Sequence, residues 1–133
     1  MEVKIYYEDT DCGGVVYYAN YLKYFERART DYLEQRGLTV QGLLKEGTQF
    51  MVVRAEVNYK SPARLGETLV IETVMSENGN ISVLFSHVIK EKTSGRVIVE
   101  GSATLVTATL ERKVKRLDES LIKRLQAPPK GER

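Results

Sequence analysis

The sequence predicts an α+β fold in which one long helix lies on one curved antiparallel sheet. Between residues 18 and 36, apolar residues recur at three- and four-residue steps, which is the spacing of one helix face. After residue 49, nearly the whole chain consists of long segments rich in Val, Ile, Thr and Phe, separated by PARLG, NGN and TSG. Such short connections favour antiparallel neighbours, because parallel strands need long crossovers. One helix packed on one sheet is therefore the expected architecture.

Length and composition limit the class of protein further. We expect one domain over residues 1–133, long enough to bury a core without disulfides. Cys12 is the single cysteine, which excludes an internal disulfide framework and a cysteine-based metal cluster within one chain. The net charge of +2 predicts no nucleic-acid partner. The first residues lack the features of a signal peptide, and no apolar run approaches the roughly 18 residues of a membrane span. We therefore expect a cytoplasmic protein without a transmembrane segment.

The first third of the chain is predicted to form a strand, a loop and two helices. The segment VKIYY indicates the first strand. The long helix is expected from about Tyr18 to Arg36, about five turns, with Gly37 at its end. Its predicted apolar stripe consists of Ala19, Leu22, Phe25, Ala28, Tyr32 and Leu33. A shorter helix over TVQGLLKEG is expected to stop at Gly47.

Four long strands and a short terminal helix are predicted for the rest. The strands cover FMVVRAEVNYKS, ETLVIETVMSE, ISVLFSHVIKEK and RVIVEGSATLVTATLERK. We expect them to form a meander, which with the first strand gives a five-stranded sheet. The tail DESLIKRLQAPPKGER begins with an Asp cap and has room for one short helix before Pro128 and Pro129.

An acidic loop precedes the long helix. In the stretch YYEDTDCGGVVYYANYLKYFERARTDYL, the residues Glu8, Asp9 and Asp11 lead into Gly13 and Gly14. Alternating oxygen groups with glycine are typical of a calcium loop, but the later bidentate Glu is missing at the expected offset, so we expect no metal. An ordinary polar turn, in which Asp11 accepts hydrogen bonds from loop N–H groups, explains the same spacing.

The helix start that follows the loop suggests a function. The N–H groups around Tyr18 to Asn20 lack helical acceptors and carry partial positive charge, so they suit an oxygen that becomes negative. Gly13 and Gly14 allow a substrate to approach the backbone closely. Asp11 would then act on the polarised carbonyl as a nucleophile or as a base for water. This chemistry suits a thioester, because it needs no metal and no catalytic triad.

The same stretch closely resembles the signature of the 4-hydroxybenzoyl-CoA thioesterase family, especially its Tol-Pal-associated acyl-CoA thioesterase branch. The likeness continues through VNYKSPARLGETLVI and the later strands. It implies a hotdog fold, in which an antiparallel sheet wraps a long central helix. It also implies homodimers whose sheets join, usually paired into homotetramers, with active sites between subunits. The implied reaction is cofactor-free hydrolysis of acyl-CoA, or of an acyl group on acyl carrier protein.

The resemblance also assigns two catalytic positions. The family's catalytic carboxylate falls on Asp11, and its carbonyl-polarising backbone amide falls on Tyr18. In the Tol-Pal-associated branch the latter position is commonly His, whereas the hydroxybenzoyl branch carries Tyr. Because the polarising group is a backbone N–H, we expect the change to leave hydrolysis intact. If that His acts as an acid or base in its branch, a phenol would not replace it near neutral pH.

Further residues are candidates for substrate binding. They are Gly14, Val15, Lys60, Ser61, Arg64 and Ser82. The first two follow the acidic residues directly. The other four lie at strand ends, where by resemblance family members hold the CoA nucleotide, and cations there suit phosphate. A solvated turn explains each of these four equally well.

Three other features favour ordinary structural roles. ERKVKR carries four cations between Arg112 and Arg116, and alternation in an edge strand explains them as well as a binding role does. His87, the only histidine, shares a strand face with Phe85 and Ile89, which favours packing over catalysis. Cys12 has no histidine base placed beside it by the sequence, so we interpret it as a loop residue.

Two classes of function remain. The favoured one is an acyl-CoA thioesterase, and the alternative is a noncatalytic hotdog scaffold that binds acyl-CoA without turnover. The dehydratase branch of the same fold normally needs a catalytic His in the helix region, and none occurs between Met1 and Phe50. The sequence does not specify the length of the acyl group or whether it is aromatic.

Overall fold

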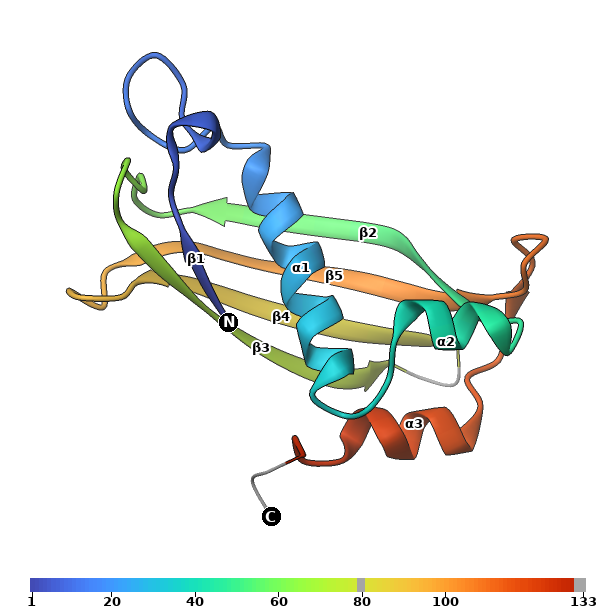
Figure 1. Cartoon of the computed structure of the whole chain (residues 1–133). Helices are drawn as coiled ribbons and strands as arrows, with labels where there is room; N and C mark the ends of the chain where they lie inside the picture. Colours follow the sequence, from blue (N-terminus) through green and yellow to red (C-terminus); the bar gives the residue numbers. More distant parts are fainter. Residues whose placement is uncertain (79–80, 131–133) are drawn as a thin grey trace.

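The computed structural model describes residues 1–78 and 81–130. Within these residues, six strands form one antiparallel sheet, and three α-helices lie beside it (Figure 1). The α+β prediction is confirmed. The expected NGN turn includes residues 79–80 and the expected tail includes residues 131–133, which lie outside the described residues. None of the described helices has the length and apolar character needed to cross a membrane.

The sheet has a different strand order from the predicted meander. Its strands are β1 (Glu2–Lys4), β2 (Gln49–Tyr59), β3 (Thr68–Asn78), β4 (Ser82–Glu91), β5 (Val97–Ala108) and β6 (Val114–Lys115). The order is β1-β3-β4-β5-β2, with β6 paired to the end of β5. The meander is therefore wrong at β2, which pairs with β5 rather than with β3. Turn residues between two strands show that the chain reverses, but not which strands become neighbours.

Six strands are present in the described residues instead of the predicted five. The ERKVKR segment contributes β6, an edge strand of two residues, which is too short to produce a recognisable sequence pattern. The predicted last strand extended to residue 113, whereas β5 ends at Ala108 and a turn separates it from β6.

The three α-helices follow one another in the predicted order, and a 3₁₀-helix that was not predicted precedes them. They are the 3₁₀-helix η1 (Tyr7–Asp9), α1 (Asn20–Glu34), α2 (Val40–Lys45) and α3 (Glu119–Gln126). The central helix α1 has 15 residues and is shorter at both ends than predicted. Asp118 caps α3 by accepting a hydrogen bond from the Ser120 N–H, as the sequence predicted.

The buried face of α1 lies beside the predicted stripe. Its buried residues are Tyr21, Tyr24, Phe25, Ala28 and Leu33. Leu22, which was expected inside, is 46% exposed, and Ala19 precedes the helix as its N-cap. The two tyrosine rings bury more area than Ala19 and Leu22 could, so they define the inner face.

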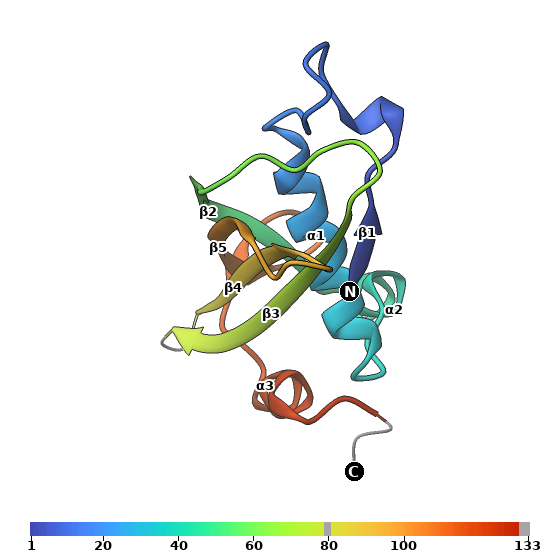
Figure 2. The same cartoon turned by 90° about the vertical axis from the view of Figure 1, so that its left-hand side faces the viewer.

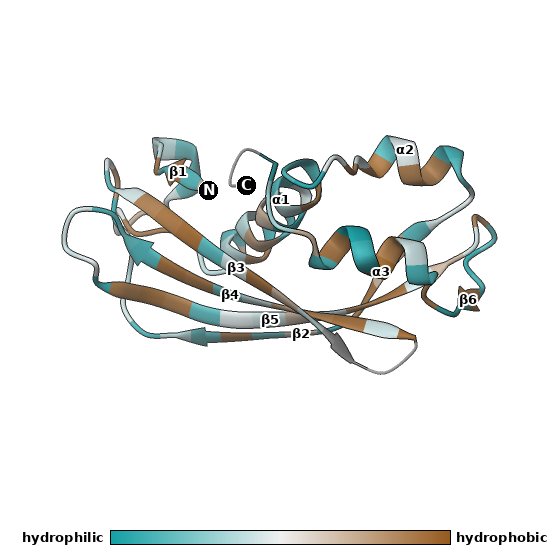
Figure 3. Cartoon of the chain, turned by 90° about the horizontal axis from the view of Figure 1, so that it is seen from below, coloured by the Kyte–Doolittle hydropathy of each residue, from teal (hydrophilic) through white to brown (hydrophobic). Residues whose placement is uncertain are grey.

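The sheet curves around α1, which crosses its concave face (Figure 2). Phe25 marks the crossing, because its ring stacks on His87 of β4 at a centroid distance of 4.7 Å. A Cβ on Gly101 of β5 would lie 2.5 Å from the same ring, so only glycine permits this approach. All three α-helices lie on one side of the sheet (Figure 3). This arrangement places the start of α1 and the loop before it at one end of the sheet.

Candidate active site

The acidic loop between β1 and α1 forms a defined turn. Oδ1 of Asp11 accepts a hydrogen bond from the Gly13 N–H at 2.8 Å, which confirms the expected bond to a loop N–H. The Gly14 N–H donates to the Asp11 carbonyl at 3.1 Å. Gly14 has a φ of +77°, a conformation that favours glycine. The turn holds the Asp11 carboxylate at the surface, where a substrate can reach it.

The connector between β2 and β3 supports this loop. Val15 forms a bridge with Arg64, and the Leu65 N–H donates to the Gly14 carbonyl at 3.1 Å. The Asp11 N–H donates to the Val15 carbonyl at 2.9 Å. Three predicted substrate-binding residues, Gly14, Val15 and Arg64, therefore lie together beside the predicted catalytic carboxylate.

The start of α1 presents two unused donors. The Asn20 N–H donates to the Tyr17 carbonyl at 2.9 Å, and the Tyr21 N–H donates to the Tyr18 carbonyl at 3.4 Å. The N–H groups of Tyr18 and Ala19 donate to no acceptor in residues 1–78 and 81–130. Both can therefore bind an external oxygen, with the positive end of the helix dipole behind them.

Asp9 ties the acidic loop to the helix start. Its carbonyl accepts hydrogen bonds from the Tyr17 N–H and from Nδ2 of Asn20, both at 3.0 Å. Its carboxylate accepts from the Tyr6 N–H at 2.9 Å. Burial, and then the Asp9 carboxylate, raise the pKa of the Tyr24 hydroxyl. Asp9 and Asn20 thus fix where the two parts of the candidate site lie relative to each other.

Tyr59 at the end of β2 contacts the same helix start. Its hydroxyl donates to the Tyr18 carbonyl at 3.3 Å, and the two ring centroids lie 6.3 Å apart. The Tyr17 ring packs against Tyr18 at 4.7 Å, and the Tyr18 hydroxyl raises the pKa of Tyr17. No sequence pattern indicated Tyr59, because its position beside the helix depends on how β2 lies in the sheet.

The other predicted substrate-binding residues do not share one rim of the sheet. Lys60 and Ser61 follow β2, at the same end as the acidic loop, and the Ser61 hydroxyl donates to the Val97 carbonyl at 2.7 Å. Ser82 is buried and begins β4 opposite Val106, at the other end of the sheet. Within one chain it does not lie with the acidic loop.

His87 and Cys12 are placed as the sequence predicted. His87 is 1% exposed and packs in the core. Burial, and then the charge of Arg29, lower its pKa to about 4. Cys12 is an exposed loop residue with a free thiol. In the described ranges, no group of three or more His, Cys, Asp or Glu residues is placed to hold a metal ion.

A central helix on a curved antiparallel sheet is the arrangement of the hotdog fold. The model of the Thioesterase superfamily matches residues 13–98. The chain belongs to this superfamily.

Curated relatives support the same branch. The acyl-CoA thioesterase YbgC of Haemophilus influenzae is 48% identical over 84 residues, which are 62% of this chain and 62% of that protein. The acyl-CoA thioester hydrolase YbgC of Escherichia coli O6:H1 is 43% identical over 84 residues, 63% of each chain. The matched part thus spans less than two thirds of these relatives. Both agree with the Tol-Pal-associated branch.

A solved structure confirms the fold. Slr0204, a 1,4-dihydroxy-2-naphthoyl-CoA thioesterase from Synechocystis, superposes with a TM-score of 0.87 at 23% identity. The similarity covers 94% of this chain and 93% of that one. It therefore extends over nearly the whole of both chains.

Proposed function

We propose that this chain is an acyl-CoA thioesterase that hydrolyses the thioester to a free acid and a thiol. One observation carries the proposal: the carboxylate of Asp11 lies in a loop that Asp9 joins directly to a helix start with two unused N–H donors. This arrangement supplies a reactive carboxylate and a site for a developing negative oxygen. The names of the YbgC relatives support the same reaction.

The proposed reaction uses both parts of the site. The thioester oxygen accepts hydrogen bonds from the N–H groups of Tyr18 and Ala19, which stabilise the negative charge of the tetrahedral intermediate. Asp11 either attacks the carbonyl carbon or removes a proton from an attacking water. In the first route, the C–S bond breaks, CoA leaves as a thiolate that takes up a proton, and water hydrolyses the resulting anhydride. In the second, the oxygen of water forms the new C–O bond, the C–S bond breaks, and the leaving thiolate takes up the proton that Asp11 removed.

The residues around the loop suit CoA as the carrier. Lys60 and Arg64 are exposed cations at this end of the sheet, and phosphate groups prefer such partners. The backbone of Gly14 and Val15 lines the approach to the carboxylate. Acyl carrier protein is the alternative carrier. Ser82 remains a predicted contact with CoA, although within one chain it lies at the other end of the sheet from the acidic loop. The chain is also proposed to assemble with further copies of itself into a homodimer or homotetramer.

Release of free thiol from acyl-CoA tests the proposal. We expect Asp11→Asn to lower kcat at least about 100-fold with little change in KM, because the amide is nearly isosteric but is neither a nucleophile nor a base. Glu8→Gln, which neutralises an exposed carboxylate in the same loop, is the matched control and should keep its activity. Full turnover in Asp11→Asn would place the chemistry elsewhere. Tight acyl-CoA binding without turnover in the wild type would favour the scaffold alternative.

A further inference from the structure

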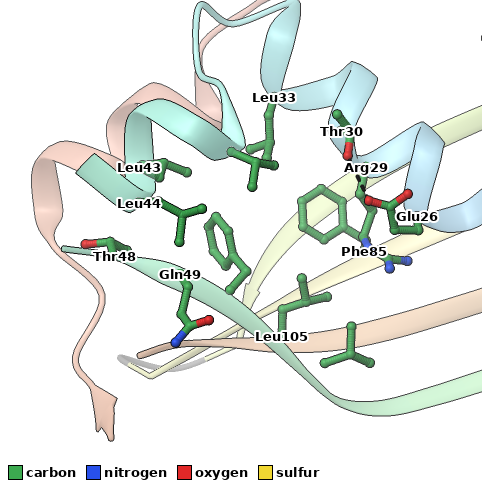
Figure 4. Close-up of a pocket in the computed structure, with 13 residues that line it drawn as sticks. Glu26, Arg29, Thr30, Leu33, Leu43, Leu44, Thr48, Gln49, Phe85 and Leu105 are labelled. Atoms are coloured by element: carbon green, nitrogen blue, oxygen red, sulfur yellow. Dashed lines mark hydrogen bonds between the residues drawn. The ribbon is translucent and has the colours of Figure 1, made fainter. Parts of the chain in front are cut away.

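A pocket lies further along α1, away from the acidic loop. Its volume is about 280 Å³, and it lies between the second half of α1, α2, the start of β2 and the sheet (Figure 4). Its apolar lining includes Leu33, Leu43, Leu44, Phe50, Phe85 and Leu105. Figure 4 shows side chains from both helices and from the sheet directed into the same space. Such a lining favours a hydrocarbon ligand.

One face of α1 connects the candidate active site with this pocket. Leu22, Glu26 and Leu33 follow one another at steps of four and seven residues, so they lie on the same helix face. Leu22 is 46% exposed, and the other two residues line the pocket. At 1.5 Å per residue, the pocket begins about 9 Å along the helix from Asn20 and extends to about 20 Å. The path between them is therefore short enough for a flexible chain.

The polar groups in the pocket wall do not prevent a hydrocarbon ligand from binding. The Thr30 hydroxyl donates to Oε1 of Glu26 at 3.2 Å (Figure 4). Arg29 is largely desolvated, which lowers its pKa, and its methylene stem is apolar. Val52, on the outer strand β2, lines the pocket and is 50% exposed. In a single chain, the pocket therefore combines an apolar interior with a side that is open at β2.

We propose that this pocket holds the alkyl chain of an aliphatic acyl group whose thioester lies at the start of α1. The inference rests on the proposed function and adds the substrate class. A single aromatic ring or a two-carbon acyl group attached at the helix start is too short to fill a pocket that extends to Leu33. The preferred substrates are therefore acyl-CoA thioesters of medium or long aliphatic chains.

The first test changes the pocket and measures chain-length preference. Leu44 lies on α2, lines the pocket and is 39% exposed, so a larger side chain there fills space without forcing the core apart. We expect Leu44→Trp to lower kcat/KM for decanoyl-CoA at least about tenfold, while acetyl-CoA and benzoyl-CoA change less than about twofold. Leu110→Trp is the matched control, because Leu110 is 54% exposed in a turn away from the pocket. Retained turnover of the short substrates also shows that the variant is folded.

The second test measures binding without chemistry. In the Asp11→Asn protein, calorimetry should show that affinity for acyl-CoA rises with chain length, by up to about fourfold for each buried methylene. Adding Leu44→Trp should remove most of this rise. If affinity rises with chain length but the wild type does not turn over acyl-CoA, the pocket assignment is supported and the thioesterase activity is rejected. If the wild type turns over acyl-CoA but affinity does not rise with chain length, the thioesterase activity is supported and the pocket assignment is rejected.

Three results would overturn the pocket assignment. One is equal activity of the wild type on acetyl-CoA and decanoyl-CoA. Another is an equal effect of Leu44→Trp on every substrate. The third concerns Leu44→Trp. If this variant keeps the chain-length profile of the wild type but has a lower sedimentation coefficient, the pocket belongs to an interface between copies of the chain.

Discussion

Asn20 links the two parts of the candidate site through its side chain. Its Nδ2 donates to the Asp9 carbonyl, two residues before Asp11, while its backbone lies in the first turn that exposes the Tyr18 N–H. The distance from the carboxylate to the unused amides therefore depends on this hydrogen bond. Small errors in such a distance reduce catalysis strongly, because the reacting atoms must be aligned.

We expect Asn20→Ala to lower kcat about tenfold with KM nearly unchanged. The lost hydrogen bond is worth about 1 kcal/mol, and the better helix propensity of Ala offsets part of this loss, so the melting temperature should change little. Gln35→Ala is the control, because it removes a side-chain amide that bonds Asp31 at the other end of α1. Thiol release and thermal unfolding measure both effects. Wild-type kcat in Asn20→Ala would show that the bond does not position the site.

The residues of the site differ in how far the sequence could indicate them. Asp11 and the Tyr18 amide belong to one continuous motif, in which a carboxylate, glycines and a helix start follow in order. Asn20 was noticed only as part of the helix start, because its bond to Asp9 depends on how the loop folds back. Tyr59 lies 41 residues beyond Tyr18, and only the sheet brings them together. The local order of carboxylate, glycines and helix start was therefore predictable, whereas the contacts from distant parts of the chain were not.

At the scale of elements, β4 and α1 together bury a histidine. The ring of His87 stacks on Phe25, and its Nδ1 lies 3.0 Å from the Thr73 hydroxyl on β3. Nε2 finds no hydrogen-bond partner among the described residues. Burial, and then the charge of Arg29 on α1, lower the pKa from 6.5 to about 4. The folded chain therefore favours the neutral imidazole.

This histidine should make stability depend on pH. The unfolded chain takes up a proton near pH 6.5 and the folded chain only near pH 4, so protonation favours unfolding. The contribution of neutral His87 to the free energy of unfolding is therefore complete above about pH 6.5 and is lost as the pH falls toward about 4. Between about pH 7.5 and about pH 5, we expect His87 to lower the free energy of unfolding by about 2 kcal/mol. Urea unfolding measures this change.

His87→Phe provides the comparison for that experiment. Phenylalanine keeps a ring against Phe25 and does not titrate, but it leaves the Thr73 hydroxyl without its partner. The absolute stability can therefore change, and the informative quantity is the difference between the two pH values. The variant should lose most of the pH dependence. Equal pH dependence in both proteins would show that His87 does not cause it.

The sequence predicted which segments form helices and strands better than it predicted which strands pair. Periodicity identified α1 and the long strands, and capping residues identified α2 and α3. The pairing of β2 with β5 was missed, because strand order depends on which apolar faces meet after folding. The connector after β2 also bonds to Gly14 in the acidic loop instead of closing a hairpin. The same long-range contacts thus determine the sheet and place the candidate site.

At the scale of the molecule, the outer strand β2 is the least protected part of the sheet. It pairs with β5 on one side and with no described strand on the other. Val52 and Val53 are 50% and 56% exposed, and Tyr59 at its end is 52% exposed. A long edge strand with exposed apolar side chains invites pairing with another chain. The single domain over residues 1–133 and the cytoplasmic location remain predictions from the sequence.

We expect the chain to form a homodimer or homotetramer at micromolar concentration, with β2 in the contact between copies. Val53 lies where the register between β2 and β5 shifts, so its side chain can be changed with little effect on that pairing. Val53→Lys should therefore weaken association, because lysine at a sheet edge opposes pairing, while leaving the fold intact. Leu110→Lys, which places the same charge in an exposed turn, is the control.

Sedimentation velocity and thiol release together test this expectation. The wild type and Leu110→Lys should sediment as a dimer or tetramer, and Val53→Lys should shift toward monomer. Activity should fall with the fraction of assembled protein, because the resemblance to the 4-hydroxybenzoyl-CoA thioesterase family places the site between subunits. A wild type that sediments only as monomer would contradict the assembly. A fully active monomer of Val53→Lys would instead show that Asp11 and the helix start of one chain suffice for the reaction.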